Sequence, residues 1–237
     1  MDLVISSRIG RERAVFRSRY RRARDYAGHI YRKARFSGLP RVLVDGLDLL
    51  GLTVRPFILY EERRAFGSAP EPAPSRDAYQ VVELGERDLE EIAAFPVRFI
   101  TLEGLRARLE AGKIGLAVKH EGRIVAFSWI DLEECNFRGY RFPLREDEAY
   151  LFDAYTSPAY RGRGLTPFLR ERVYQDLESR GRRRYFSFSD ALNRPANNFK
   201  RKLGAQKLEL GLHIRLRGGL QRYRILRRYG ASKPHLR

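Results

Sequence analysis

Residues 161–164, Arg-Gly-Arg-Gly, form the part of this chain whose composition is best suited to chemistry. Glycines allow successive backbone N–H groups to turn toward one point, and the two guanidinium groups add positive charge. Residues 149–156 precede them with an apolar pattern that predicts a β-strand, and an apolar helical repeat follows them. A strand, a glycine loop and a helix N-terminus together favour the binding of a pyrophosphate. A surface turn with two solvated arginines is the alternative interpretation.

The helix after this loop has its own start and stop signals. Thr166 is expected to be its N-cap and Pro167 its first residue, because proline lacks the N–H that this position leaves unpaired. Gly181 is expected to end the helix. Apolar residues recur at four-residue spacing and predict a buried face, formed by Leu165, Leu169, Val173 and Leu177.

Asp153 interrupts the apolar strand before the loop. A carboxylate at such a position must find a partner or change its pKa. It is therefore a candidate base, and a structural aspartate paired with an arginine or with backbone N–H groups is the alternative. Asp131, Glu133 and Glu134 end the preceding expected strand and could reach the same cleft. A solvated strand end is the preferred interpretation of these three acids.

The positive charge of the chain is concentrated at its two ends. The 237 residues include 47 Lys and Arg against 29 Asp and Glu, which gives a formal net charge of +18. Residues 1–35 hold 11 basic and 3 acidic side chains, and residues 211–237 hold 8 basic and no acidic ones, whereas the middle is nearly neutral. Such ends suggest a polyanionic partner, which could be anionic lipid, nucleic acid or an acidic carrier protein.

A proline-rich polar stretch at residues 67–75 predicts a stiff linker. Residues 1–66 are expected to form an appended basic extension, with helices at 10–36 and 42–50 and a strand at 53–61. The helix at 10–36 is amphipathic and basic, so it either packs on its own domain, which we prefer, or lies on an anionic membrane. Residues 76–218 are expected to form the main domain, and residues 219–237 a basic C-terminal tail.

The main domain is predicted to alternate strands and helices. Strands are expected at 79–84, 113–120, 123–132, 149–156, 185–189, 206–209 and 212–216, and helices at 86–95, 101–111, about 167–180 and 194–203. Residues 133–147 are expected to be a polar, aromatic-rich excursion. This order is typical of an α/β fold with a mixed sheet.

Several kinds of site are disfavoured by the composition. Cys135 is the single cysteine, which excludes an intrachain disulfide and a cysteine-based metal site, and the four histidines form no ligand pattern. No metal is therefore expected, and Cys135, His120 and His213 are interpreted as structural. No run of about 18 apolar residues occurs, and the first residues lack the shape of a signal peptide. A cytoplasmic protein is expected, with basic ends that allow attachment to the inner membrane surface.

Two motifs give the chain a resemblance to a known family. Residues 158–166, Pro-Ala-Tyr-Arg-Gly-Arg-Gly-Leu-Thr, resemble the Arg/Gln-x-x-Gly-x-Gly/Ala pyrophosphate loop of the GNAT superfamily of acyl-CoA N-acyltransferases. Residues 193–205, Asn-Arg-Pro-Ala-Asn-Asn-Phe-Lys-Arg-Lys-Leu-Gly-Ala, resemble the helix segment of that family that an asparagine opens beside the coenzyme. The resemblance covers about residues 79–210. The stretch at 148–156 also looks like GNAT proteins encoded near bacterial polysaccharide and cell-envelope genes.

The resemblance implies a GNAT-like α/β fold, with a central mixed, mostly antiparallel twisted sheet flanked by helices. It implies direct transfer of an acyl group, most often acetyl, from acetyl-CoA or another acyl-CoA to a primary amine, without a metal. Amino sugars or other envelope precursors are the favoured acceptors, bound by variable loops at 95–112 and 133–147. The alternatives are a nucleic-acid-binding or membrane-surface-binding protein on this scaffold, and transfer from an acyl carrier protein.

The resemblance also assigns the site. The implied coenzyme contacts are Ala154, Tyr155, Thr156, Arg161, Gly162, Arg163, Gly164, Leu165, Thr166, Asn193 and Lys200. A backbone N–H near Tyr155 or Thr156 is expected to stabilise the thioester oxygen in the transition state. Lys200 replaces the tyrosine with which many members protonate the leaving thiolate, so Tyr155 and Tyr160 are candidate acids, with packing as the alternative for both. Asp153 remains the candidate base.

Overall fold

The computed structural model describes residues 44, 46–48, 51–63, 78–95, 100–217 and 219–230. The helix expected at 10–36, the linker at 67–75 and residues 231–237 lie outside the described residues, as does most of the helix expected at 42–50. None of the described helices is both long and apolar enough to span a membrane.

The elements follow the expected order closely. The strands are β1 (Leu52–Glu62), β2 (Tyr79–Glu83), β3 (Ile114–His120), β4 (Arg123–Asp131), β5 (Glu134–Phe137), β6 (Tyr140–Pro143), β7 (Glu148–Thr156), β8 (Arg184–Asp190), β9 (Gln206–Leu216) and β10 (Gln221–Arg228). The helices are η2 (Glu86–Asp88), α3 (Leu89–Ala93), α4 (Leu102–Glu110), η3 (Pro158–Tyr160), α5 (Leu165–Ser179) and α6 (Arg194–Lys202). Gly181 and Gly204 follow α5 and α6 with φ values of 79° and 69°, as helix-ending glycines do.

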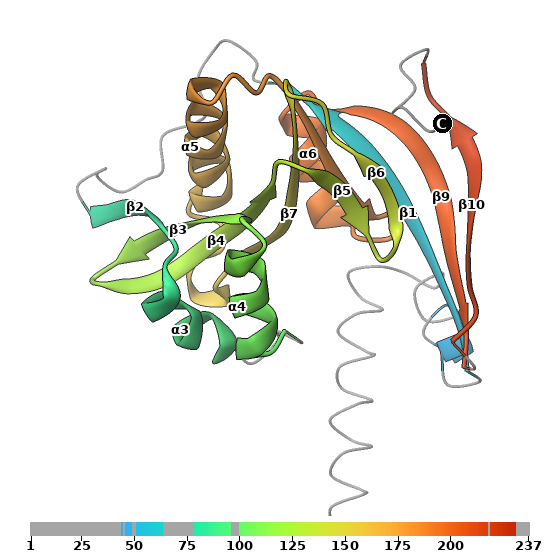
Figure 1. Ribbon diagram of the computed structural model, residues 1–237, viewed down its shortest axis with the longest axis horizontal. Coiled ribbons are helices and arrows are strands. Elements are labelled where there is room, and N and C mark those ends of the chain that lie inside the picture. The colour runs from blue at the N-terminus through green and yellow to red at the C-terminus, as the bar shows by residue number, and fades with distance from the viewer. Residues whose placement is uncertain are drawn as a thin grey trace, which may run out of the picture.

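Eight strands form one sheet in the order β10-β9-β1-β8-β7-β4-β3-β2 (Figure 1). The only parallel neighbours in this described sheet are β7 and β8, and every other pair is antiparallel. This is the mixed, mostly antiparallel sheet that the resemblance implies. The remaining two strands, β5 and β6, form a separate hairpin.

Strand β1 corrects the expectation that residues 1–66 are appended to the domain. It pairs with β8 on one side and with β9 on the other, so it is an interior strand of the sheet. Phe57 and Leu59 on this strand are fully buried. Local sequence predicted the strand itself, but its partners lie in the second half of the chain and no local pattern identifies them.

The structure refines one further expectation and contradicts two. Residues 133–147 contain the hairpin β5–β6, whose Cys135 and Phe142 are buried against the sheet. The two strands expected at 206–209 and 212–216 are one strand, β9, because a bulge opposite Leu59 and Tyr60 lets a continuous strand follow β1. Residues 221–228 of the expected tail form β10, since they pair with β9 along their whole length.

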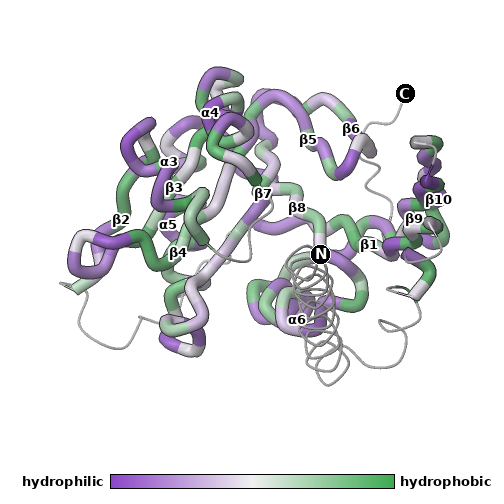
Figure 2. The backbone as a smooth tube through the Cα atoms, turned by 90° about the horizontal axis from the view of Figure 1, so that it is seen from below, coloured by the Kyte–Doolittle hydropathy of each residue, from purple (hydrophilic) through white to green (hydrophobic). Residues whose placement is uncertain are grey.

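Helices cover both faces of the β2–β4 and β7 part of the sheet (Figure 1). On one face, α5 packs its apolar stripe on β3, β4 and β7. On the other face, α3 and α4 surround Trp129 of β4. The β5–β6 hairpin covers part of β1 and β8. Figure 2 shows many polar positions on β10, at the edge of the sheet.

Candidate functional site

Strands β7 and β8 separate after a short parallel pairing. Their register runs only from Glu148 opposite Arg184 to Tyr150 opposite Phe186. Beyond Tyr150, β7 continues along β4 and β8 continues along β1. Within the described chain no ladder joins the two strands past this point, so a ligand inserted between them meets backbone N–H and C=O groups.

Asp153 lies where β7 is irregular. The register between β4 and β7 shifts between Phe127 and Trp129, and Asp153 has a φ of 50°, which is uncommon for a residue other than glycine. A bulge of this kind turns backbone groups and side chains away from the regular ladder. Backbone geometry of this kind is often found at functional sites.

The loop after β7 has the backbone geometry of an anion site. Gly162 and Gly164 have φ values of 79° and 74°, a conformation that glycine adopts without strain. Helix α5 begins at Leu165 with Gly164 as its N-cap, so the N–H groups of its first turn face the loop. Arg161 and Arg163 on the loop are both exposed. The loop therefore offers oriented N–H groups and two full positive charges to one ligand.

The expected N-cap, Thr166, lies inside the first turn of α5, as does Pro167. Its hydroxyl is 3.0 Å from the hydroxyl of Thr156, at the end of β7. Thr166 therefore ties the helix to the strand instead of capping the helix. The expected start was two residues late because the left-handed Gly164 opens the helix before the Thr-Pro pair is reached.

The side chains of the loop are held by nearby groups. Arg161 donates from Nε to the carbonyl oxygen of Thr156 at 3.2 Å. The guanidinium group of Arg163 lies 5.0 Å from the ring centre of Tyr160. The hydroxyl of Tyr160 is 3.1 Å from Nδ1 of His120. These contacts fix the arginines beside the loop while their remaining N–H groups can meet a phosphate.

Asn193 caps α6 as expected. Its Oδ1 accepts a hydrogen bond from the backbone N–H of Ala196 at 3.2 Å. The neighbouring Asn197 bonds the hydroxyl of Tyr60 at 3.0 Å, so α6 is attached to β1 as well as to the end of β8.

Asp153 is paired with an arginine. Arg108 of α4 donates from Nη1 to Oδ2 of Asp153 at 2.7 Å, and both side chains are largely buried. The same guanidinium group lies 5.1 Å from the ring centre of Trp129 and 5.0 Å from that of Phe152. The structure thus shows the ion pair that the structural interpretation of Asp153 anticipated. It also places this carboxylate at the bulge of β7.

The remaining candidate residues, Tyr155 and Asp131, contact other side chains and backbone groups of the protein. Tyr155 packs against Phe95 and Phe127, and its ring centre lies 5.1 and 5.7 Å from theirs.

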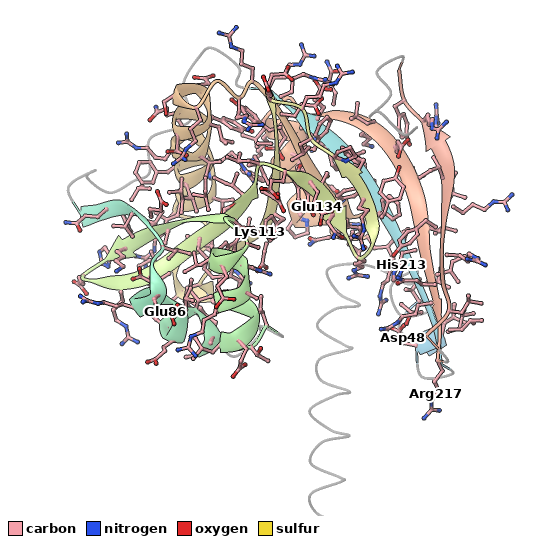
Figure 3. The ribbon with its side chains drawn as sticks, in the orientation of Figure 1. Asp48, Glu86, Lys113, Glu134, His213 and Arg217 are labelled. Atoms are coloured by element: carbon pink, nitrogen blue, oxygen red, sulfur yellow. The ribbon has the colours of Figure 1, made fainter. Side chains whose placement is uncertain are left out.

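Asp131 is buried, forms an ion pair with Lys113, and accepts hydrogen bonds from the backbone N–H groups of residues 133 and 134. Asp131 therefore shapes the turn after β4, which corrects its interpretation as part of a solvated strand end. Figure 3 labels Lys113 and Glu134 in this region. The described residues contain no group of His, Cys, Asp and Glu able to hold a metal ion.

Lys200 belongs to a buried cluster and does not face the loop. It is 5% exposed, and its Nζ donates to Glu62 Oε1 at 2.6 Å and also bonds Ser187. Glu62 additionally accepts from the hydroxyl of Tyr174 at 2.6 Å and lies 3.5 Å from Nε of Arg170. We therefore assign Lys200 to this cluster and not to direct contact with a coenzyme.

Each charged group in the cluster stabilises the ionised form of its oppositely charged neighbour. Burial alone would raise the pKa of Glu62, but the charges of Arg170 and Lys200, with hydrogen bonds from Lys200 and Ser187, hold it well below its usual range. Burial lowers the pKa of Lys200, and the neighbouring Glu62 opposes that shift. A fully buried carboxylate is thus kept ionised by two cations.

Sequence reasoning missed Glu62, Arg108 and Arg170. Glu62 lies in the segment expected to be an appended extension, and Arg108 lies in an expected helix without a motif that singles it out. Arg170 carried a usable signal, since it lies one turn from Thr166 and from Tyr174 on the side of α5 that faces the core. A charged residue on a buried helix face implies a buried partner.

Three solved structures of other proteins are similar to this chain. A solved structure of a Drosophila protein is 15% identical with a TM-score of 0.52, covering 76% of this chain and 57% of that one. A protein described as an acetyltransferase of the GNAT family from Novosphingobium aromaticivorans is 23% identical with a TM-score of 0.49, covering 68% of this chain and 65% of that one. A predicted acetyltransferase with acetyl-CoA from Clostridium acetobutylicum is 16% identical with a TM-score of 0.40, covering 54% and 90%.

The chain spans less than two thirds of the length of the first two of these proteins. No curated protein sequence matches it. The model of the acetyltransferase (GNAT) family matches residues 78–205, which is more than half of the chain. The match contains both motifs, the diverging strands β7 and β8, and the glycine loop. The chain therefore belongs to the GNAT acetyltransferase family.

Proposed function

We propose that this protein transfers an acyl group, most often acetyl, from acyl-CoA directly to a primary amine. The observation that carries the proposal is the left-handed Gly162 and Gly164 between the diverging strand β7 and the N-terminus of α5, flanked by Arg161 and Arg163. That arrangement suits the pyrophosphate of CoA. The pantetheine arm would then run along β7, past Thr156, Tyr155 and Ala154, toward the bulge. Ala154 is exposed at this point of the strand.

The chemistry requires three things of the protein: a group that stabilises the oxyanion, a base that takes the amine proton, and an acid that protonates the thiolate. The amine nitrogen attacks the thioester carbonyl carbon and forms a C–N bond. The C–S bond then breaks, and CoA leaves as the thiolate. A backbone N–H of β7 near Tyr155 or Thr156 stabilises the oxyanion. Asp153 takes the proton of the ammonium group, directly or through water, because it is the carboxylate placed at the bulge.

A tyrosine can protonate the thiolate in this scheme. We propose Tyr155 for this role, since it lies on β7 two residues from Asp153, whereas the hydroxyl of Tyr160 is already engaged by His120. Thiolate is a weak base, so this step contributes less than the removal of the amine proton. Asn193 positions α6 beside the opening between β7 and β8.

The acceptor is proposed to be an amino sugar or another envelope precursor. This rests on the likeness of the stretch at 148–156 to proteins encoded near envelope genes. We propose that the loops at 95–112 and 133–147 bind it, because α4 in the first of these loops contributes Arg108 to the ion pair with Asp153 and so lies beside the candidate base.

The β9–β10 hairpin supports an anionic membrane surface as partner. Leu216 and Leu220 are 46% and 52% exposed at the two sides of its turn, and Arg215, Arg217 and Arg222, which lie within two residues of them in the sequence, are exposed as well. Figure 3 shows Arg217 pointing away from the molecule at the end of β9. Exposed leucines gain nothing from a nucleic acid backbone, whereas a lipid headgroup layer accommodates both the leucines and the arginines.

Calorimetric titration with acetyl-CoA at moderate salt tests the donor site. We expect binding in the wild type, a loss of more than about tenfold in affinity for Arg161→Gln, and no measurable binding for Gly164→Trp, which forces a bulky residue into a left-handed position. Arg87→Gln removes an exposed arginine from η2 and serves as the control that keeps wild-type affinity. Equal affinity in wild type and Arg161→Gln would remove the loop from the donor site.

A further inference from the structure

A small pocket lies between α5 and the strands β4 and β7. Its lining comprises Phe127, Ser128, Ala154, Tyr155, Thr156, Thr166, Leu169 and Arg170. The pocket adjoins the segment of β7 between the bulge and the glycine loop, which is the segment along which the proposed donor extends. It has room for a group about the size of one water molecule.

Two polar groups that line this pocket lack partners. Arg170 is 5% exposed and Ser128 is 2% exposed. Within the described part of the chain, Nη1 of Arg170 and Oγ of Ser128 have no hydrogen-bond partner. A buried guanidinium N–H without an acceptor is costly, and the large majority of buried polar groups are paired. Both groups can donate, so the partner that suits them is an oxygen that accepts.

The charges around Arg170 indicate that the accepting oxygen should be negatively charged. The buried cluster behind the pocket contains the cations Arg170 and Lys200 and the single anion Glu62. Glu62 is shared between the two cations through different oxygens, at 3.5 Å from Arg170 and 2.6 Å from Lys200. The cluster therefore carries one more positive than negative charge in a buried site, where an uncompensated charge is expensive. A negatively charged oxygen in the pocket would balance it.

We propose that the pocket receives one oxygen of the terminal carboxylate of the acyl group, with the rest of the acyl chain outside the pocket beside β7, so that the preferred donor is the CoA thioester of a dicarboxylic acid. This inference rests on the proposed function and specifies the donor for the same site. The reaction is unchanged: the amine attacks the thioester carbonyl, CoA leaves as the thiolate, and the distal carboxylate stays intact in the product amide. Arg170 and Ser128 hold that carboxylate through Nη1 and Oγ.

Succinyl-CoA and butyryl-CoA provide a matched pair of probes. Their acyl chains each contain four carbons, and they end in a carboxylate and in a methyl group, respectively. Calorimetric titration of the wild-type protein is expected to show succinyl-CoA binding at least about tenfold more tightly than butyryl-CoA, because only the former pairs with the guanidinium group. Equal affinities would overturn the inference, and the pocket would then hold a water or an uncharged oxygen.

Variants separate this subsite from the donor site as a whole. Ser128→Ala and Arg170→Met are both expected to reduce the ratio of the two affinities, Arg170→Met to about one. Arg161→Gln is the control, since it should weaken both thioesters equally and keep the ratio. Arg170 also pairs with Glu62, so thermal melting checks that Arg170→Met is folded, and Ser128→Ala provides the test if it is not.

The outcomes distinguish the two proposals. Tight binding of butyryl-CoA and acetyl-CoA without preference for succinyl-CoA would keep the proposed function and overturn the carboxylate subsite. An unchanged ratio in folded Arg170→Met and in Ser128→Ala would overturn the subsite as well. Absence of binding by every thioester would overturn the proposed function, and this inference with it.

Discussion

At the scale of single residues, Asp153 is both a structural and a chemical candidate. Its ion pair with Arg108 fixes the carboxylate at the bulge of β7, and its φ of 50° shows that the backbone there is shaped by its surroundings. A structural aspartate and a base predict different consequences of the same substitution. If Asp153 is structural, the substitution lowers stability. If Asp153 is the base, the substitution lowers turnover.

We expect Asp153→Asn to lower turnover by at least about a hundredfold, because the amide cannot take the amine proton. Affinity for acetyl-CoA should remain near that of the wild type, since Asp153 is not part of the glycine loop. Steady-state kinetics, with calorimetry and thermal melting in parallel, measure these three quantities. A fully active variant with a lowered melting temperature would assign Asp153 to structure alone.

His213 gives a pH-dependent prediction. It is 4% exposed, stacks on Tyr223, and burial lowers its pKa below 6.5, with nearby arginines acting in the same direction and the bond to Gln221 opposing them. In the unfolded chain the imidazole gains a proton as the pH falls through about 6.5, whereas the folded protein resists that proton. Stability should therefore decline as the pH falls from about 7.5 to 5.5.

Chemical denaturation at these two pH values measures the effect. His213→Gln should reduce the difference in unfolding free energy between pH 7.5 and 5.5, because glutamine does not titrate. His120→Gln is the comparison, as its ring contacts Tyr79 and Tyr160 at the other end of the sheet. If wild type and His213→Gln show the same pH dependence of the unfolding free energy, His213 does not contribute to it.

At the scale of elements, β1 decides whether the chain is one folding unit. Phe57 is fully buried between β8 and β9, and its ring lies against Gly211, where an added Cβ would approach to 2.5 Å. The strand also delivers Glu62 to the cluster that holds α5 and α6. Removing this strand would therefore open the middle of the sheet.

Phe57→Ala is expected to lower the unfolding free energy by about 3–5 kcal/mol, as large-to-small changes of buried aromatics do. Denaturation should remain a single transition in which the capacity to bind acetyl-CoA is lost together with helical signal. Gln80→Ala, an exposed change on β2, is the control and should alter stability by less than about 0.5 kcal/mol. Two separate transitions would indicate an independently folding extension after all.

At the scale of the whole molecule, charge is separated along the sheet. The β9–β10 hairpin is rich in arginine, residues 211–237 contain no acid, and the β2–β4 end carries a balanced mixture of charges. Arg222 and Arg224 are exposed on β10, the strand at the edge of the sheet. A polyanionic surface would therefore approach the molecule from this end.

Arg222→Gln with Arg224→Gln should weaken binding to phosphatidylserine vesicles by about tenfold or more at low salt, at about 1 kcal/mol for each arginine. Co-sedimentation measures this binding, and high salt should abolish it. Arg87→Gln with Arg123→Gln removes the same charge from the other end of the sheet and should leave it nearly unchanged. Tight binding to RNA and none to vesicles would replace lipid with nucleic acid as the partner.

The sequence by itself determined the features that depend on neighbouring residues. Gly162 and Gly164, the apolar stripe of α5 and the Asn193 cap were all predicted, because left-handed turns, helical periodicity and capping act within a few positions. The same local rules placed most strand boundaries within two residues. They also carried the family resemblance, since both of its motifs are continuous in sequence.

Tertiary structure decided everything that joins distant segments. The place of β1 between β8 and β9, the pair of Arg108 with Asp153, and the cluster of Glu62, Arg170 and Lys200 link residues that local patterns treat separately. Long-range strand pairing determines which charged side chains become buried, and burial determines which of them need partners. The pocket beside Arg170 is a consequence of that burial, which is why only the folded chain reveals it.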